Sequence, residues 1–245
     1  MKITIFNGSP KGKFSATNIM VEEFLADVKN NFKSFDNIFL AEKNINACKG
    51  CFSCWVKTPG KCIIKDDMEE LLHKYISSDY VVFASPLYVD NVTGIMKKFF
   101  DRLIPLINPH IEEDFKGESI HRKRYEKYPK IIAISNCGFS EQSHFQVVSL
   151  MYKRICRNMH SKLIAEIYRG EGPLLVMDNE TLYPYIDNYK SLLRKAGTEL
   201  FEGNKISDKT MCELERPIIP HEVYKSIINQ NWESRLLLKR RETSD

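Results

Sequence analysis

The sequence lacks any apolar run long enough to span a bilayer, and Met1-Lys2 leads into a short apolar segment without the hydrophobic region of a signal peptide. It also lacks a strong charge of one sign, because 36 Lys and Arg residues against 32 Asp and Glu leave a formal net charge of +4. That charge is too small to indicate nucleic acid binding. We therefore expect a cytoplasmic protein whose partners are neither membranes nor nucleic acids.

Two common nucleotide-binding motifs are absent as well. There is no G-x-G-x-x-G dinucleotide fingerprint, and the segment from Gly8 to Lys13 is one residue short of a P-loop, with Phe14 where Ser or Thr would hold magnesium. The six histidines are scattered, and no His, Asp and Ser constellation indicates hydrolysis. These absences exclude a Rossmann nucleotide site, a P-loop and a hydrolytic triad.

The sequence opens instead on a short apolar run, residues 3–6, which predicts a buried strand. Gly8 begins a turn, and Ser15 and Thr17 stand where a helix over residues 19–28 must start. Free backbone N–H groups, the positive end of the helix dipole and hydroxyl donors then point at one place. This pattern predicts an anion site, with an ordinary capping turn as the alternative.

Strand and helix patterns alternate along the rest of the chain. Apolar runs predict further strands over residues 35–40, 80–84, 130–134 and 162–168, and helices are expected over 69–77, 145–159, 183–201 and 220–241. The polar segment 105–129 interrupts the pattern as an insertion. We predict an α/β protein in which helices cover both faces of a parallel sheet. We expect one domain over residues 1–245, with a core over 1–170 and a helical extension over 171–245.

Cysteine is concentrated in one segment, since four of the seven cysteines fall within fifteen residues: Cys48, Cys51, Cys54 and Cys62. In a reducing compartment they are thiols, metal ligands or redox groups rather than structural disulfides. Two-residue gaps let successive thiolates converge on one centre, and a turn at Pro59-Gly60 brings back the fourth.

Three other accounts of the cysteine segment stay open. Structural zinc is one, although zinc ligands usually form two well-separated pairs. A loop of reduced thiols without metal fits about as well as a cluster, and Trp55 beside Cys54 suits either. A catalytic Cys51-x-x-Cys54 dithiol is the weakest, because such a pair is activated chiefly at a helix N-terminus and no helix start is predicted there.

Three loops, each at the end of a predicted strand, resemble the cofactor loops of the flavodoxin-like NAD(P)H-dependent FMN reductases, a family that includes the iron-sulfur flavoproteins. They read G-S-P-K from Gly8, S-P-L-Y from Ser85 and S-N-C-G-F-S-E from Ser135. The resemblance covers about residues 1–170 and implies a doubly wound parallel sheet of five strands. It departs from the family at Ala16, where one phosphate donor is missing.

The resemblance implies the following site residues, with the chemistry on the flavin and no catalytic side chain. The FMN phosphate falls to Ser9, Lys11, Ser15, Thr17 and Asn18. The loop against the flavin ring is Pro86, Leu87, Tyr88, Val89 and Asn91. The loop at the pyrimidine edge is Asn136, Cys137, Gly138, Phe139 and Glu141. The spacing C-x2-C-x2-C-x7-C is similar to the motif that holds a [4Fe-4S] cluster near the flavin in iron-sulfur flavoproteins, on Cys48, Cys51, Cys54 and Cys62.

These features predict an FMN-dependent oxidoreductase that passes electrons from NAD(P)H to a small acceptor such as a flavin, quinone or nitro compound. The alternative is a non-enzymatic iron-sulfur flavoprotein that exchanges electrons with a protein partner, and a third is a partner-binding protein without cofactor. The resemblance also implies a homodimer or homotetramer. We expect the insertion at 105–129 either to cover the flavin or to contact a second subunit.

Overall fold

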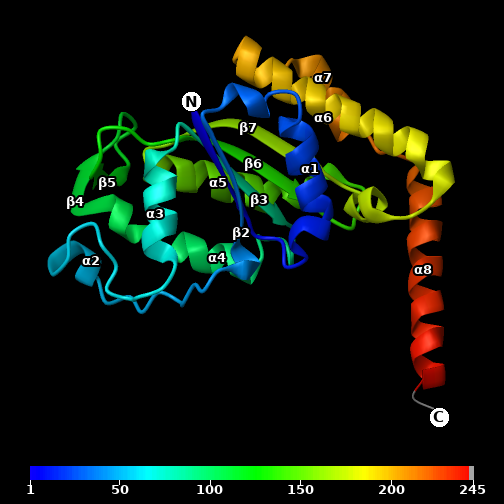
Figure 1. Cartoon of the computed structure of the whole chain (residues 1–245), viewed down its shortest axis with the longest axis horizontal. Coiled ribbons are helices and arrows are strands. Elements are labelled where there is room, and N and C mark those ends of the chain that lie inside the picture. The colour runs from blue at the N-terminus through cyan, green and yellow to red at the C-terminus, as the bar shows by residue number, and fades with distance from the viewer. Residues whose placement is uncertain (243–245) are drawn as a thin grey trace.

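The computed structural model describes residues 1–242, with side chains to residue 239, and its centre is a parallel sheet of five strands in the order β2-β1-β3-β6-β7 (Figure 1). The strands are β1 (Lys2–Asn7), β2 (Ser34–Phe39), β3 (Tyr80–Pro86), β6 (Lys130–Asn136) and β7 (Lys162–Arg169). All neighbouring strands pair in parallel. The predicted five-stranded, doubly wound sheet is therefore confirmed, and its strand order reverses between β1 and β3.

Helices cover both faces of this sheet (Figure 1). On one face lie α1 (Ala16–Leu25) and α6 (Tyr183–Gly203), and on the other α3 (Met68–Ser77), α4 (Gly94–Asp101) and α5 (Gln146–Asn158). Successive residues of each strand point to opposite faces, so Ile5 packs toward α1 and Phe6 toward α4. Because both faces are buried, the central strands are apolar without alternation.

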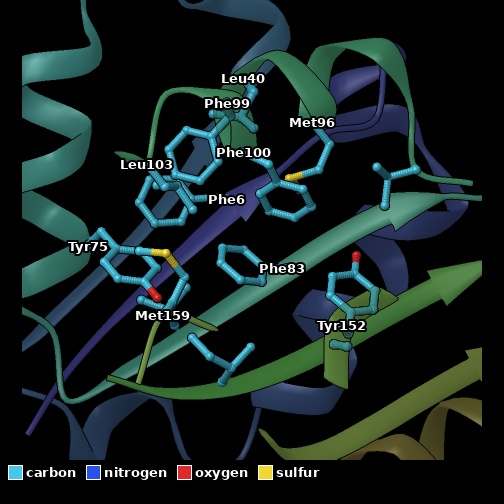
Figure 2. Packing of buried hydrophobic residues seen from close by; sticks show 14 of the residues in the cluster. Phe6, Leu40, Tyr75, Phe83, Met96, Phe99, Phe100, Leu103, Tyr152 and Met159 are labelled. Atoms are coloured by element: carbon cyan, nitrogen blue, oxygen red, sulfur yellow. The ribbon is translucent and has the colours of Figure 1, made fainter. Parts of the chain in front are cut away.

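Aromatic side chains fill the face toward α3, α4 and α5 (Figure 2). Phe6 stacks on Phe99 with ring centroids 4.4 Å apart. Phe83 meets Phe100 edge-on at 4.9 Å, and Tyr75 and Tyr152 lie on either side of Phe83 (Figure 2). This core fixes the position of α4, which joins the two candidate sites described below.

The other face is completed by α6, which begins beyond the expected core of residues 1–170. Leu193 and Ala196 of this helix are fully buried against the sheet. Gly197 approaches α1 so closely that an added Cβ would lie 1.8 Å from the carbonyl oxygen of Phe24. One of the two sheet faces is thus shared by α1 and α6.

The insertion folds as an antiparallel hairpin, β4 (Ile107–Glu113) and β5 (Ser119–Lys123). Its mostly exposed residues give no apolar alternation, so the sequence did not predict these strands. Arg157 of α5 anchors it, with Nε donating to the Asp114 carboxylate at 2.9 Å. The hairpin also meets the cysteine segment, since the rings of His121 and Trp55 lie 5.0 Å apart.

The remaining helices are α2 (Ser53–Val56), α7 (Asp208–Glu215) and α8 (His221–Glu242). Neither α2 nor α7 was predicted, whereas α8 confirms the helix expected at 220–241. Short 3-10 turns occupy Gly12–Phe14, Lys29–Asn31, Leu40–Glu42, Ile104–Leu106, Gln142–Phe145, Gly172–Val176 and Glu180–Leu182. No helix among the described residues combines the length and apolarity that crossing a membrane requires.

The predicted strands agree with the structure to within two residues, but the first helix begins three residues earlier than expected. Ser15 is its N-cap, and the Ser15 hydroxyl accepts a hydrogen bond from the backbone N–H of Asn18 at 3.0 Å. The apolar pattern locates the buried face of a helix, whereas the cap locates its start.

Candidate functional site

The loops that follow β1, β3 and β6 line one cleft of about 530 Å³ at the carboxyl ends of the strands. This is the position at which open α/β sheets bind ligands, and the volume is typical of a small-molecule site. Ten of the predicted site residues line it: Ser9, Lys11, Ser15, Thr17, Pro86, Leu87, Tyr88, Asn136, Cys137 and Gly138. The structure therefore brings together the three loops that the sequence singled out.

The start of α1 supplies the polar end of the cleft. The Thr17 hydroxyl accepts a hydrogen bond from Nδ2 of Asn136 at 2.7 Å, which leaves its own hydrogen to donate to a ligand. Ser15 donates its hydroxyl to the carbonyl of Gly12 at 2.7 Å, so it fixes the loop rather than offering a donor. The backbone N–H groups of Ala16 and Thr17 lie in the first turn, where a helix has no internal acceptor for them.

Asn18 does not line the cleft, because its side chain is used inside the protein. Its Nδ2 donates to Glu22 at 2.9 Å, and its Oδ1 accepts from Asn37 at 2.9 Å. The side chain is buried and cross-links α1 to β2. It does not replace the phosphate donor that is missing at Ala16.

The loop after β1 is clamped by the start of α4. Thr93 Oγ1 donates to the carbonyl of Gly8 at 2.7 Å, and the Gly8 N–H donates to the carbonyl of Ala84 at 2.8 Å. An added Cβ at Gly8 would lie 2.8 Å from Cβ of Met96. Glycine is needed here because the loop packs directly on α4.

The loop after β3 turns sharply at its tip. Tyr88 and Asn91 exchange backbone hydrogen bonds of 2.8 and 3.2 Å, and between them Val89 and Asp90 have φ of 47° and 58°. The turn directs Val89 into solvent at 97% exposure, so neither Val89 nor Asn91 lines the cleft. The N–H of Leu87 is also paired, with the carbonyl of Asn136.

The loop after β6 enters the cleft only with its first residues. Burial raises the pKa of the Cys137 thiol, as expected of a packed side chain rather than a redox group. Phe139 stacks instead on His144 with centroids 4.3 Å apart, and Glu141 lies 3.6 Å from that imidazole. Phe139 and Glu141 therefore lie outside the cleft.

Two parts of the cleft wall were missed by sequence reasoning. The loop after β7 contributes Gly172, Pro173, Val176, Met177 and Asp178, and α8 contributes Ile228, Asn231, Trp232 and Arg235. The Gly170 to Pro173 turn was a usable signal, since it too follows a strand. Helix α8 has no motif, and its position comes from Tyr224, whose hydroxyl donates to the carbonyl of Gly138 at 2.7 Å.

The four clustered cysteines line a second cavity, together with Arg102 at the end of α4. Cys48 and Cys51 are exposed, and Cys54 and Cys62 are half-buried. All four are free thiols. Among the described residues, no three His, Cys, Asp or Glu side chains converge closely enough to hold a single metal ion.

A helix does begin inside the cysteine segment, which corrects the expectation that none starts there. The single turn of α2 starts at Ser53, after Phe52 in the left-handed conformation with φ of 51°. A hydrogen bond with the Ser53 side chain lowers the pKa of Cys51, whereas burial raises the pKa of Cys54. The pKa values of the two thiols of the C-x-x-C pair are thus shifted in opposite directions.

The donor set of the second cavity fits an iron-sulfur cluster. Thiolates are the ligands that such clusters use, and four cysteines line the same cavity. Arg102 is almost fully buried, and within the described chain its Nε has no hydrogen-bond partner. A buried N–H group beside a set of sulfur atoms is suited to an anionic, sulfur-rich ligand.

Within one chain the two cavities lie at opposite ends of α4, and among the described residues none lines both. The cleft borders the loop that leads into α4, and the cysteine cavity includes Asp101 and Arg102 at its end. An α-helix of this length spans about 12 Å. The hairpin likewise packs beside the cysteine segment rather than over the cleft, so within one chain it does not cover the cleft.

The fold is flavodoxin-like, and its ligand-binding loops lie where the strand order reverses between β1 and β3. The sequence model of the NADPH-dependent FMN reductase family matches residues 1–148, and the chain belongs to this family. FMN and NAD(P)H are accordingly the cofactors of its family, as the sequence indicated.

Curated relatives of the chain are named iron-sulfur flavoproteins. The chain is 38% identical over 105 residues to an iron-sulfur flavoprotein of Archaeoglobus fulgidus, covering 43% of this chain and 46% of the relative. It is 39% identical over 109 residues to an iron-sulfur flavoprotein of Clostridioides difficile, covering 42% and 45%. The chain spans about half the length of the curated relatives it matches.

Solved structures share the fold. An FMN-dependent NADH-azoreductase from Bacillus anthracis in complex with FMN has a TM-score of 0.59 at 17% identity, over 81% of this chain and 98% of that one. An NAD(P)H:quinone oxidoreductase from Methanothermobacter marburgensis has a TM-score of 0.59 at 15% identity, over 82% and 96%. At these identities the likeness establishes the architecture.

Proposed function

We propose that the chain is an FMN-dependent oxidoreductase that passes electrons from NAD(P)H through bound flavin to a small acceptor. The observation that carries this proposal is that three separate loops, each resembling a cofactor loop of the family, line one cleft at the switch point. Bound FMN supplies the hydride and electron transfer. The side chains of the cleft bind and orient it.

The phosphate end of the cleft is assigned to the start of α1. Lys11 and the helix dipole offset the charge of a phosphate dianion, and the Thr17 hydroxyl and the first-turn N–H groups of the helix donate to it. Asn136 holds the Thr17 hydroxyl in place from the neighbouring loop. Because a terminal phosphate suits this helix end, we expect FMN to bind in preference to FAD.

The ring end is assigned to the loops after β3 and β6. Pro86, Leu87 and Tyr88 form one wall and Cys137 and Gly138 another. Tyr88 is half-exposed and lines the cleft, where an aromatic face can stack on a planar ligand. Helix α8 lines the remaining side of the cleft.

Steady-state kinetics test the enzymatic proposal. We expect NADH or NADPH oxidation that depends on bound FMN and turns over with added flavin, quinone or nitroaromatic acceptors. Tight FMN binding without turnover on any of these acceptors would contradict an enzyme and favour the electron carrier. A chain that binds no FMN would contradict both and favour a cofactor-free binding protein.

We also propose a second role, electron exchange with a protein partner through a [4Fe-4S] cluster on Cys48, Cys51, Cys54 and Cys62. The shared cavity of these thiols supports it, as do the names of the relatives. The cysteine segment carries basic side chains, because Lys49, Lys57 and Lys61 are exposed and the adjacent strand β5 adds Lys123. Such a surface favours an acidic partner.

Anaerobic reconstitution tests the cluster. About four iron and four acid-labile sulfide per chain would support it. The Cys51→Ala variant should lose that iron and keep its FMN, because the two cavities are separate. Negligible iron uptake by the wild-type chain with FMN intact would leave a packed thiol loop.

A further inference from the structure

A buried ion pair lies beneath the cysteine segment. Arg102 is 1% exposed, and the side chain of Asp66 is fully buried. Nη1 and Nη2 of Arg102 donate to the two carboxylate oxygens of Asp66 at 2.7 and 3.0 Å, and Nη1 also donates to the carbonyl of Asn46 at 2.8 Å. This bidentate hydrogen bonding fixes the plane of the guanidinium group.

The remaining edge of the guanidinium is unpaired. Its Nε–H is buried and has no hydrogen-bond partner within the described chain. Arg102 lines the cavity that the four cysteines share, and although burial opposes it, Asp66 and Cys62 raise the pKa of its guanidinium. A buried, charged N–H without an acceptor is costly, so its position beside sulfur atoms suggests that the acceptor belongs to the site.

We propose that Arg102 is the positioning residue of the cysteine site, with its Nε–H donating to sulfur at Cys62 or at the bound cluster. This inference rests on the proposed cluster. Four thiolates would give such a cluster a net negative charge, which would be larger by one in its reduced state. Arg102 stabilises the reduced state more than the oxidised one and so raises the reduction potential. The step transfers one electron from a reductant such as dithionite, and no covalent bond forms or breaks.

Asp66 holds the arginine in this orientation. Its carboxylate accepts hydrogen bonds from the backbone N–H groups of Asn46 at 2.9 Å and Met68 at 3.1 Å, in addition to those from Arg102. The carboxylate therefore lies on the side of the guanidinium opposite Nε. A lysine at position 102 would keep the charge but could not make the paired contact and the Nε–H contact together.

The test compares reduction potentials of anaerobically reconstituted proteins. In Arg102→Gln we expect the equilibrium constant for one-electron reduction of the cluster to fall about tenfold, a decrease of about 59 mV. Arg102→Lys should lie between this variant and the wild type. Arg194→Gln is the matched control, because it breaks an arginine-carboxylate pair with Glu23 between α6 and α1, away from the cysteine cavity, and should keep the wild-type potential.

Iron analysis separates the two proposals. No iron in the wild-type chain would overturn the inference together with the cluster, whereas a wild-type cluster with an unchanged potential in Arg102→Gln would overturn the inference alone. Loss of iron from Arg102→Gln that Arg102→Lys restores would support it. If Arg102→Gln does not fold, the double variant Arg102→Gln/Asp66→Asn removes both buried charges and serves for the same measurement.

Discussion

Asp66 links the stability of the chain to pH through the hydrogen bonds that its buried carboxylate accepts. Burial alone would raise the pKa of this carboxyl, but the hydrogen bonds from Arg102, Asn46 and Met68 together outweigh it and lower the pKa to about 2. The carboxyl has its ordinary, higher pKa in the unfolded chain, so the stabilisation is complete above about pH 4 and is lost as the pH falls toward 2.

We therefore predict that the wild-type chain loses more unfolding free energy between pH 5 and pH 3 than Asp66→Asn does. The variant starts less stable because Arg102 keeps an uncompensated charge, but it has no carboxyl to protonate at this position. Urea unfolding at pH 5 and pH 3 measures the unfolding free energy that each protein loses. An equal loss in the two proteins would show that Asp66 does not titrate as the structure indicates.

At this scale, a sequence motif identifies side chains near the cleft but not which of their atoms are free. Thr17 keeps a hydroxyl donor because Asn136 supplies its acceptor contact from a distant loop. Asn18 loses its donors to Glu22 and to the carbonyl of Lys13, both within α1 and the loop before it. A long-range partner such as Asn136 depends on the assembled fold and is not predicted by local spacing, whereas the partners of Asn18 are local groups that compete with a ligand for its donors.

Helix α6 is the element whose packing is most constrained. A Cβ at Gly197 would overlap the backbone of α1, so Gly197→Ala should lower the unfolding free energy by about 2 kcal/mol even though alanine favours helix. Gly203→Ala in the same helix is the control, because within the described chain no atom lies within 4 Å of its added Cβ. Urea unfolding of both variants gives the comparison, and equal stabilities would contradict the close contact of α1 and α6.

Elements with a clear apolar pattern were predicted, and those held by polar contacts were not. The central strands were predicted from continuous apolar runs, and the long helices from the helical spacing of their apolar residues. The β4-β5 hairpin depends on ion pairs with α5, such as Arg157 with Asp114, and α7 begins with a Ser207 cap inside a polar stretch. In sequence, neither the residues of the hairpin nor those of α7 differ from an ordinary surface loop.

At the scale of the molecule, we propose that residues 1–242 form one folding unit. The apolar cluster beneath α1 includes side chains from β1, β3, β6, α6 and α8, so the C-terminal helices share a core with the sheet. The C-terminal part of α8 extends away from the body (Figure 1). Its Leu236, Leu237 and Leu238 are 58%, 58% and 62% exposed.

Exposed leucines on a protruding helix agree with the proposed homodimer or homotetramer. Light scattering at micromolar concentration should give two or four times the chain mass of 28.5 kDa with flavin bound. Replacing Leu236 and Leu238 with serine should shift the assembly toward monomer without loss of FMN. A wild-type monomer that retains flavin would contradict the proposal.

The central claim is that the loop before α1 binds the phosphate of FMN in the cleft that Trp232 also lines. An FMN titration followed by tryptophan fluorescence in a Trp55→Phe background, which leaves Trp232 as the remaining tryptophan, tests it most directly. We predict saturable quenching in this background and in Thr17→Ser, which keeps the hydroxyl, and none in Thr17→Glu, which sets a negative charge against the phosphate. The same FMN affinity in Thr17→Glu as in Thr17→Ser would contradict the account.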